Sequence, residues 1–144
     1  MAETPPHESW FRGSNRSPLF QALGVRAEDI SEGYARYRVE PVPASVDGDG
    51  VLDSLAITTA ADQAVVACVS TVIDPRREAM NGTAEMNLTY VARPTGAVQV
   101  DARIVHKGPH LAVVDLEVRD ESGALVARGR GSYATRPLDH GAPR

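Results

Sequence analysis

The chain has 144 residues, of which 42% are hydrophobic and 24% are charged, and its formal net charge is −4 at pH 7. A chain of this length and composition is expected to form one soluble domain with a hydrophobic core. The negative net charge argues against nucleic acid or an anionic membrane as a partner. The single cysteine, Cys68, excludes a disulfide framework and a thiolate metal site.

The two ends of the chain predict tails. Residues 1–16 are polar and contain two prolines, so we expect a flexible N-terminal tail. No apolar run of the signal-peptide type occurs there, which favours a cytoplasmic location. We expect a single folded domain over residues 17–136 and a C-terminal tail over residues 137–144.

The domain begins with short elements. A helix is predicted from Ser17, which can cap its N-terminus, through Pro18 in the first turn to Gly24 at its end. Residues 25–41 predict two short strands that turn around Gly33.

A loop and a long apolar helix are the most informative part of the sequence. Residues 47–53 read Asp-Gly-Asp-Gly-Val-Leu-Asp, and the apolar residues 54–72 follow directly. The helix must end before Pro75, because proline disfavours a helical conformation in the residue before it. Its polar residues argue against a membrane span. A carboxylate in the middle of such a helix, Asp62, is costly unless it is paired, hydrated or used, so it indicates a functional site.

The C-terminal half predicts strands. After a charged loop at residues 74–82, apolar and polar residues alternate, and Gly, Pro and Asp clusters interrupt the alternation. This pattern indicates an antiparallel meander, and together with the apolar helix it favours an α+β fold whose sheet wraps the helix. The predicted strands are residues 83–92, 98–107, 111–119 and 125–133.

Residues 17–135 resemble the hotdog-fold acyl-CoA thioesterases of the phenylacetate-pathway type. The resemblance rests on the short helix ending at Gly24 and on the loop and helix after Asp47. It also rests on Tyr-Val-Ala-Arg-Pro ending at Pro94 and on Val-His-Lys-Gly-Pro-His-Leu-Ala-Val-Val from Val105. It implies a hotdog fold, an acyl-CoA substrate, no cofactor, no metal, and a homodimer or homotetramer.

The motif of that family matches this chain in part. The family has Asn, Gly three residues later, His-Gly-Gly, and an Asp or Glu nine residues after the His. Matching the acid to Asp62 places Asp47 at the Asn position and Asp53 at the His position. The other matched positions are Gly50 at the first glycine, and Ser54 and Leu55 at the two glycines after the His.

The resemblance also implies roles for these residues. The backbone N–H of Ser54 would polarise the thioester carbonyl at the start of the helix. Asp62 would act as a general base on water or as a nucleophile, and Asp47 would help to place the water. The residues expected to contact the substrate are Gly50, Asp53, Leu55 and Val66.

Helix geometry predicts that the site needs two subunits. Residues nine apart on an ideal helix differ by roughly 180° in direction and by about 13–14 Å along the axis. Asp53 and Asp62 of one chain therefore cannot point into one small site. A site that combines the helix start with Asp62 requires a dimer with two symmetric sites.

Other interpretations of these residues remain open. Asp62 is also compatible with a structural acid at a subunit interface, and Asp53 with an N-cap of the helix. Asp47 is equally well explained as a turn residue. A calcium loop is disfavoured because the required glutamate is absent. The polar helix residues that either line a pocket or satisfy helix carbonyls are Thr58, Thr59 and Gln63.

The sequence is compatible with other functions as well. A hotdog protein that binds acyl-CoA without hydrolysing it is the main alternative, because the His-Gly-Gly triplet is missing. A hydratase or dehydratase is weaker, because no histidine follows the acidic loop at a useful spacing. Candidates for contact with the phosphates of coenzyme A are Arg93, Lys107, Arg128 and Arg130.

Overall fold

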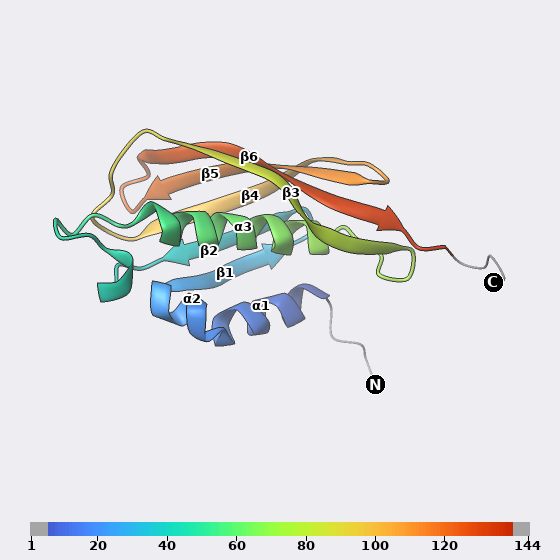
Figure 1. Ribbon diagram of the computed structural model, residues 1–144, viewed down its shortest axis with the longest axis horizontal. Helices are drawn as coiled ribbons and strands as arrows, with labels where there is room; N and C mark the ends of the chain where they lie inside the picture. Colours follow the sequence, from blue (N-terminus) through green and yellow to red (C-terminus); the bar gives the residue numbers. More distant parts are fainter. Residues whose placement is uncertain (1–5, 140–144) are drawn as a thin grey trace.

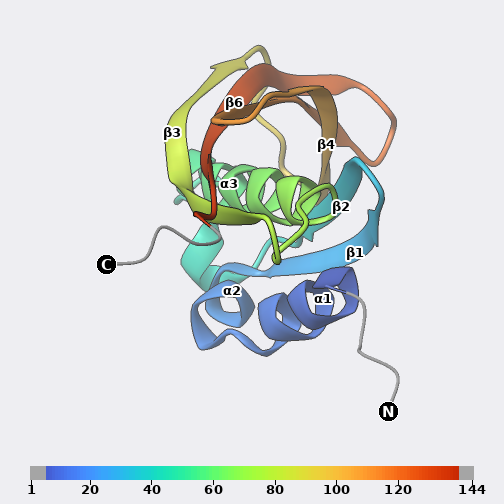
Figure 2. The ribbon, with the colours of Figure 1, turned by 90° about the vertical axis from the view of Figure 1, so that its right-hand side faces the viewer.

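The computed structural model describes residues 6–139 and shows an α+β fold in which one antiparallel sheet curls around a central helix (Figures 1 and 2). The central helix is α3 (Ser54–Ser70), and a short 3₁₀ helix, η1 (Pro43–Ser45), precedes it. The six strands have the order β1-β2-β4-β5-β6-β3. Their bounds are β1 (Val25–Ser31), β2 (Tyr34–Val39), β3 (Glu78–Tyr90), β4 (Val98–Lys107), β5 (Leu111–Asp120) and β6 (Leu125–Pro137).

The core lies between α3 and the concave face of the sheet. It consists mainly of alanine and valine side chains, which let the helix lie close to the strands. At Gly131 of β6, an added Cβ atom would lie only 2.6 Å from Cγ2 of Val65 in α3. A distance this short shows that Gly131 is required there for its lack of a side chain.

The strand predictions are largely confirmed, with two corrections. The predicted meander holds for β4, β5 and β6, but β3 pairs with β6 at the edge of the sheet and not with β4. The charged loop predicted for residues 74–82 is shorter, because β3 already begins at Glu78. Alternation identifies a strand but says nothing about which strand it pairs with.

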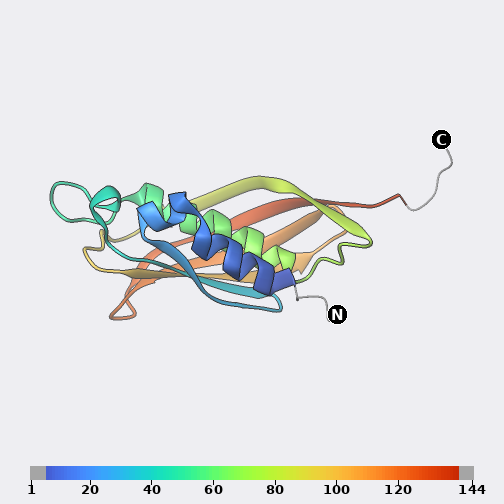
Figure 3. The same cartoon turned by 90° about the horizontal axis from the view of Figure 1, so that it is seen from below.

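The predicted N-terminal tail is wrong over residues 6–16, which form helix α1 (Pro6–Arg16); residues 1–5 lie outside the described part. Two polar side chains fix α1 against the sheet. The Ser14 hydroxyl bonds to the Tyr37 hydroxyl at 2.7 Å, and the Asn15 side chain bonds to the backbone N–H and C=O of Ala27 in β1. Seen from below, α1 and the following α2 (Pro18–Leu23) lie in front of α3 (Figure 3), and α1 contacts both β1 and α3.

The predicted C-terminal tail is corrected at its start and otherwise lies outside the description. Strand β6 extends to Pro137, and the N–H of Leu138 donates to the carbonyl of Arg77. Residues 140–144 are not among those described.

The two edges of the sheet differ. Helix α1 and Asn15 cover part of the β1 edge, whereas β3 pairs with β6 on one side only. No residue of β3 is fully buried. One stripe of α3 beside β3 is also left partly exposed by its own chain, and it includes Leu55, Thr58 and Asp62. The helices within residues 6–139 lack the length and hydropathy that crossing a bilayer requires.

Candidate active site

The acidic loop before α3 is a tight, self-bonded turn. Val46 and Leu52 form a β-bridge, and Oδ1 of Asp47 accepts hydrogen bonds from the N–H groups of Asp49 at 2.9 Å and Val51 at 3.0 Å. The N–H of Gly50 donates to the Asp47 carbonyl, and Gly50 has a φ of 76°, which favours glycine. The interpretation of Asp47 as a turn residue is therefore confirmed.

The electrostatics of Asp47 follow from these bonds. The N–H groups of Val51 and Asp49, and then the guanidinium of Arg93, lower the pKa of its carboxyl below the ordinary value. Arg93 lies 3.2 Å from Oδ2. Asp47 is thus an anion at neutral pH with both oxygens engaged, which makes it a weak proton acceptor. Its expected role in placing water stays a prediction.

Asp53 caps α3, as one of its two interpretations predicted. Its backbone is extended (φ −67°, ψ 136°), and its side chain accepts a hydrogen bond from the N–H of Leu55 at 2.7 Å. The N–H of Ser54 has no acceptor within hydrogen-bond distance among residues 6–139. The start of α3 therefore offers one free backbone donor, at the end of the helix that carries positive potential.

A cavity of about 380 Å³ opens at this helix start. The loop supplies Asp47, Asp53 and Ser54 to its lining, and the end of β3 and the following segment supply Tyr90 and Arg93. It thus brings together three of the predicted site residues. Gly50, Leu55 and Val66 do not line it; Leu55 is 72% exposed and Val66 is buried at 9%.

Tyr90 connects β3 to the first turn of α3. Its hydroxyl donates to the carbonyl of Ser54 at 3.2 Å and lies 2.9 Å from the hydroxyl of Thr58. Burial, opposed by the hydrogen bond with Thr58, raises the pKa of Tyr90, so it remains a neutral hydrogen-bonding group at neutral pH. Tyr90 was not predicted as a site residue, and its only sequence signal was its place in the Tyr-Val-Ala-Arg-Pro segment.

Asp62 lies further along α3 and is partly exposed. Its Oδ1 accepts a hydrogen bond of 2.7 Å from the hydroxyl of Thr83 in β3. This bond fixes the carboxylate on the side of the helix that faces the open edge strand. Burial, followed by the charge of Asp62, raises the pKa of the neighbouring Tyr133. Asp62 does not line the cavity at the helix start, in agreement with the geometric prediction for one chain.

The remaining candidates have mostly structural contacts. Lys107 pairs with Glu78 and Arg130 with Asp115. Burial raises the pKa of the Cys68 thiol to about 12, so it is an unreactive core group. Among the side chains described, those of residues 8–139, no three His, Cys, Asp or Glu side chains are grouped as metal ligands.

Comparison with known proteins identifies the family. A family model described as the thioesterase superfamily matches residues 56–127, which is half of the chain. The chain belongs to the thioesterase superfamily. A provisionally named esterase of Halobacterium salinarum is 28% identical over 80% of this chain and 82% of its own length. Another, from Saccharolobus solfataricus, is 25% identical over 80% of this chain and 75% of its own length.

Solved structures of this superfamily share the hotdog fold. A mutant thioesterase of Pseudomonas aeruginosa superimposes with a TM-score of 0.81 at 20% identity, covering 94% of this chain and 97% of its own. The PaaI protein of the E. coli phenylacetic acid degradation operon superimposes with a TM-score of 0.74 at 17% identity, with the same coverages. The predicted hotdog fold of PaaI-like type is therefore confirmed.

Proposed function

We propose that this thioesterase hydrolyses an acyl-CoA thioester in a site that two subunits share. The observation that carries the proposal is the position of two groups on α3. The free N–H of Ser54 lies at the helix start, and the carboxylate of Asp62 lies eight residues later, about 2.2 turns along α3, beside the open β3 edge. About 12 Å of helix separates them within one chain, so they can meet only across an interface.

The open edge explains how such an interface forms. A second copy of β3, antiparallel to the first, would use the unpaired backbone groups of both strands and cover both exposed stripes of α3. The helices would then run in opposite directions side by side. This arrangement brings the start of each α3 towards the middle of the other, where Asp62 lies.

The chemistry follows from these two groups. The thioester carbonyl oxygen accepts a hydrogen bond from the Ser54 N–H, and the positive end of the helix stabilises the negative charge that develops on it. Asp62 of the partner subunit takes a proton from water as the water oxygen attacks the carbonyl carbon. The tetrahedral intermediate then collapses, the C–S bond breaks, and the thiolate of coenzyme A leaves as the carboxylic acid forms. Thr83 keeps Asp62 in position.

The first test removes each group separately. Asp62→Asn keeps the size of the side chain but cannot accept the proton, so we expect thiol release from acyl-CoA to fall about 100-fold or more. Ser54→Pro removes the N–H together with the hydroxyl: proline is well tolerated at the first helical position, and the extended backbone of Asp53 suits a residue before proline. Ser54→Ala keeps the N–H and is the matched control, which should retain activity.

Mixing the two inactive variants tests the shared site. If Ser54 and Asp62 act across subunits, half of the randomly mixed dimers are hybrid and each hybrid has one intact site, so about a quarter of the wild-type activity returns. No recovery after verified subunit exchange, or a fully active monomer by light scattering, would refute the shared site. Saturable acyl-CoA binding by a wild-type protein that releases no thiol would instead favour the non-hydrolytic alternative.

A further inference from the structure

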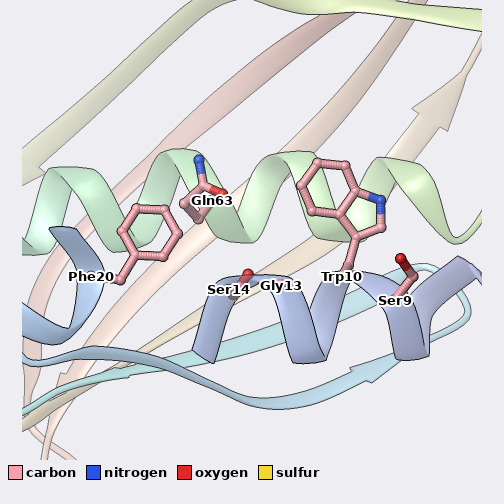
Figure 4. Close-up of a pocket in the computed structure, with 6 residues that line it drawn as sticks. All are labelled: Ser9, Trp10, Gly13, Ser14, Phe20 and Gln63. Carbon is pink, nitrogen blue, oxygen red and sulfur yellow. The ribbon is translucent and has the colours of Figure 1, made fainter. Parts of the chain in front are cut away.

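A second cavity lies on the other flank of α3, between that helix and the N-terminal helices (Figure 4). Its volume is about 370 Å³. Helices α1 and α2 form one wall and α3 forms the other. The lining residues are Ser9, Trp10, Gly13, Ser14, Phe20 and Gln63.

Two of the seven aromatic side chains of the chain line this cavity. Trp10 is the only tryptophan, and Phe20 is one of two phenylalanines, in a chain with 5% aromatic residues. Both rings are only partly buried, although both contact the core. Figure 4 shows Gln63 on α3 between the two rings. The cavity therefore offers two apolar ring surfaces on either side of an amide.

The amide of Gln63 is available for a ligand. Among the side chains and backbone that the structure describes over residues 8–139, no group lies within hydrogen-bond distance of it, and the same holds for the indole N–H of Trp10. The Ser14 hydroxyl, in contrast, is already bonded to Tyr37. Buried or half-buried amides usually have partners, so a free amide between two aromatic rings is suited to binding a polar atom of an otherwise apolar ligand.

The position of Gln63 links this cavity to the proposed chemistry. Gln63 directly follows Asp62, so their Cα atoms lie about 3.8 Å apart and their side chains diverge by about 100° around the helix. When the acyl carbonyl is held beside Asp62, the mouth of this cavity therefore lies only a few bonds further along the acyl chain.

We propose that this cavity binds the acyl group of the thioester, and that Trp10 and Gln63 of the subunit that supplies Asp62 determine acyl specificity. The inference rests on the proposed function. The apolar part of the acyl group packs between Trp10 and Phe20, and a hydroxyl or oxo group near its third carbon bonds to the Gln63 amide. An apolar cavity of about 150 Å³ holds a benzene molecule, so the larger volume here suits a compact acyl group of medium size.

The kinetic test compares three substrates: acetyl-CoA, hexanoyl-CoA and 3-hydroxyhexanoyl-CoA. Gln63→Leu removes the amide at similar size, and we expect the preference for the hydroxyacyl over the plain hexanoyl substrate in kcat/KM to fall about tenfold. Trp10→Ala should lower kcat/KM for both longer substrates by at least about tenfold and leave acetyl-CoA within about twofold. Phe11→Ala is the matched control, since Phe11 is on the same helix and does not line the cavity.

Two outcomes of this test would overturn the proposal. One is an equal loss for acetyl-CoA and the longer substrates in Trp10→Ala, which would mean that Trp10 only stabilises α1. The other is an unchanged hydroxyacyl preference in Gln63→Leu.

A binding measurement separates this proposal from the catalytic one. Because Trp10 is the only tryptophan, its fluorescence reports on this cavity alone. Saturable quenching of the wild-type protein by 3-hydroxyhexanoate, weakened in Gln63→Leu and absent with coenzyme A alone, supports the cavity even if no thioester is hydrolysed. Lack of quenching in a protein that hydrolyses 3-hydroxyhexanoyl-CoA rules the cavity out and leaves the catalytic proposal intact.

Discussion

The N-cap carboxylate of α3 is expected to slow the reaction that the same helix promotes. The Asp53 carboxylate accepts a hydrogen bond of 2.7 Å from the N–H of Leu55. The proposed oxyanion donor is the N–H of Ser54, one residue before Leu55 in α3. An oxyanion about 3 Å from the Ser54 nitrogen would lie roughly 5 Å from the Asp53 carboxylate, from ordinary hydrogen-bond lengths. Two negative charges at that distance repel each other, and this repulsion raises the barrier.

The size of the effect follows from Coulomb's law. The repulsion is roughly 1 kcal/mol in a water-like dielectric and roughly 3 kcal/mol at an effective dielectric constant of about 20. Asp53 is exposed, so we take the lower value, which corresponds to about a fivefold change in rate. Asp53→Asn keeps an N-cap oxygen and removes the charge, so kcat should rise about fivefold while stability is retained.

The control and the measurement separate charge from capping. Asp53→Ala removes both, so the free energy of unfolding should fall by about 1 kcal/mol in urea titrations. Thiol release gives kcat for each variant. A fall in kcat of more than about tenfold in a fully folded Asp53→Asn protein would refute the reasoning and make Asp53 a catalytic acid or base.

Two further predictions concern stability. Gly131→Ala places a Cβ atom 2.6 Å from Cγ2 of Val65, so it should lower the free energy of unfolding by about 1–3 kcal/mol. The control is Gly48→Ala, where no atom lies within 4 Å of the added Cβ. Equal urea midpoints for the two variants would contradict the close packing at Gly131. Burial opposes ionisation of Asp101, but hydrogen bonds from Arg36 and Tyr34 outweigh it and lower its pKa. A lowered pKa stabilises the fold above the ordinary value near 4 and ceases to do so as the pH falls through the lowered value. The Tm of the wild type should therefore exceed that of Asp101→Asn at pH 7, and this gap should close below about pH 4; a gap that does not change with pH would disprove the ion-pair account.

The parts of the fold that local sequence determines were predictable. The apolar run after Asp53 predicted α3 because capping and apolar composition act within a few residues. Helix α1 was missed because residues 6–16 contain only two large apolar side chains. Its contacts, Ser14 with Tyr37 and Asn15 with Ala27, join residues far apart in the chain.

The same distinction applies to the site. The cap at Asp53 is local and was predicted, whereas Thr83 and Tyr90 reach α3 from a strand 21 and 36 residues away. In a regular strand over residues 83–92, Ala84 and not Thr83 would share a face with Met86. Irregularities between Thr83 and Glu85 shift that alternation, so Thr83 faces Asp62 instead. The residue that hydrogen-bonds to Asp62 is therefore decided by strand pairing, which the sequence pattern does not encode.

Strand β3 pairs with β6, which is the last strand of the chain to be synthesised, and this order has a consequence for biosynthesis. The pairs of β3 with β6 run from Tyr90 with Ala127 to Glu78 with Pro137, so a ribosome must make all of β4 and β5 before the partner strand of β3 exists. During that interval both sides of a 13-residue strand are unsatisfied, and the nascent chain is exposed to adventitious strand pairing and to chaperones that bind such segments. The polar residues along β3, including Glu85 and Asn87, reduce this hazard. Replacing them with valine should lower the soluble yield on expression more than it alters the stability of the finished protein.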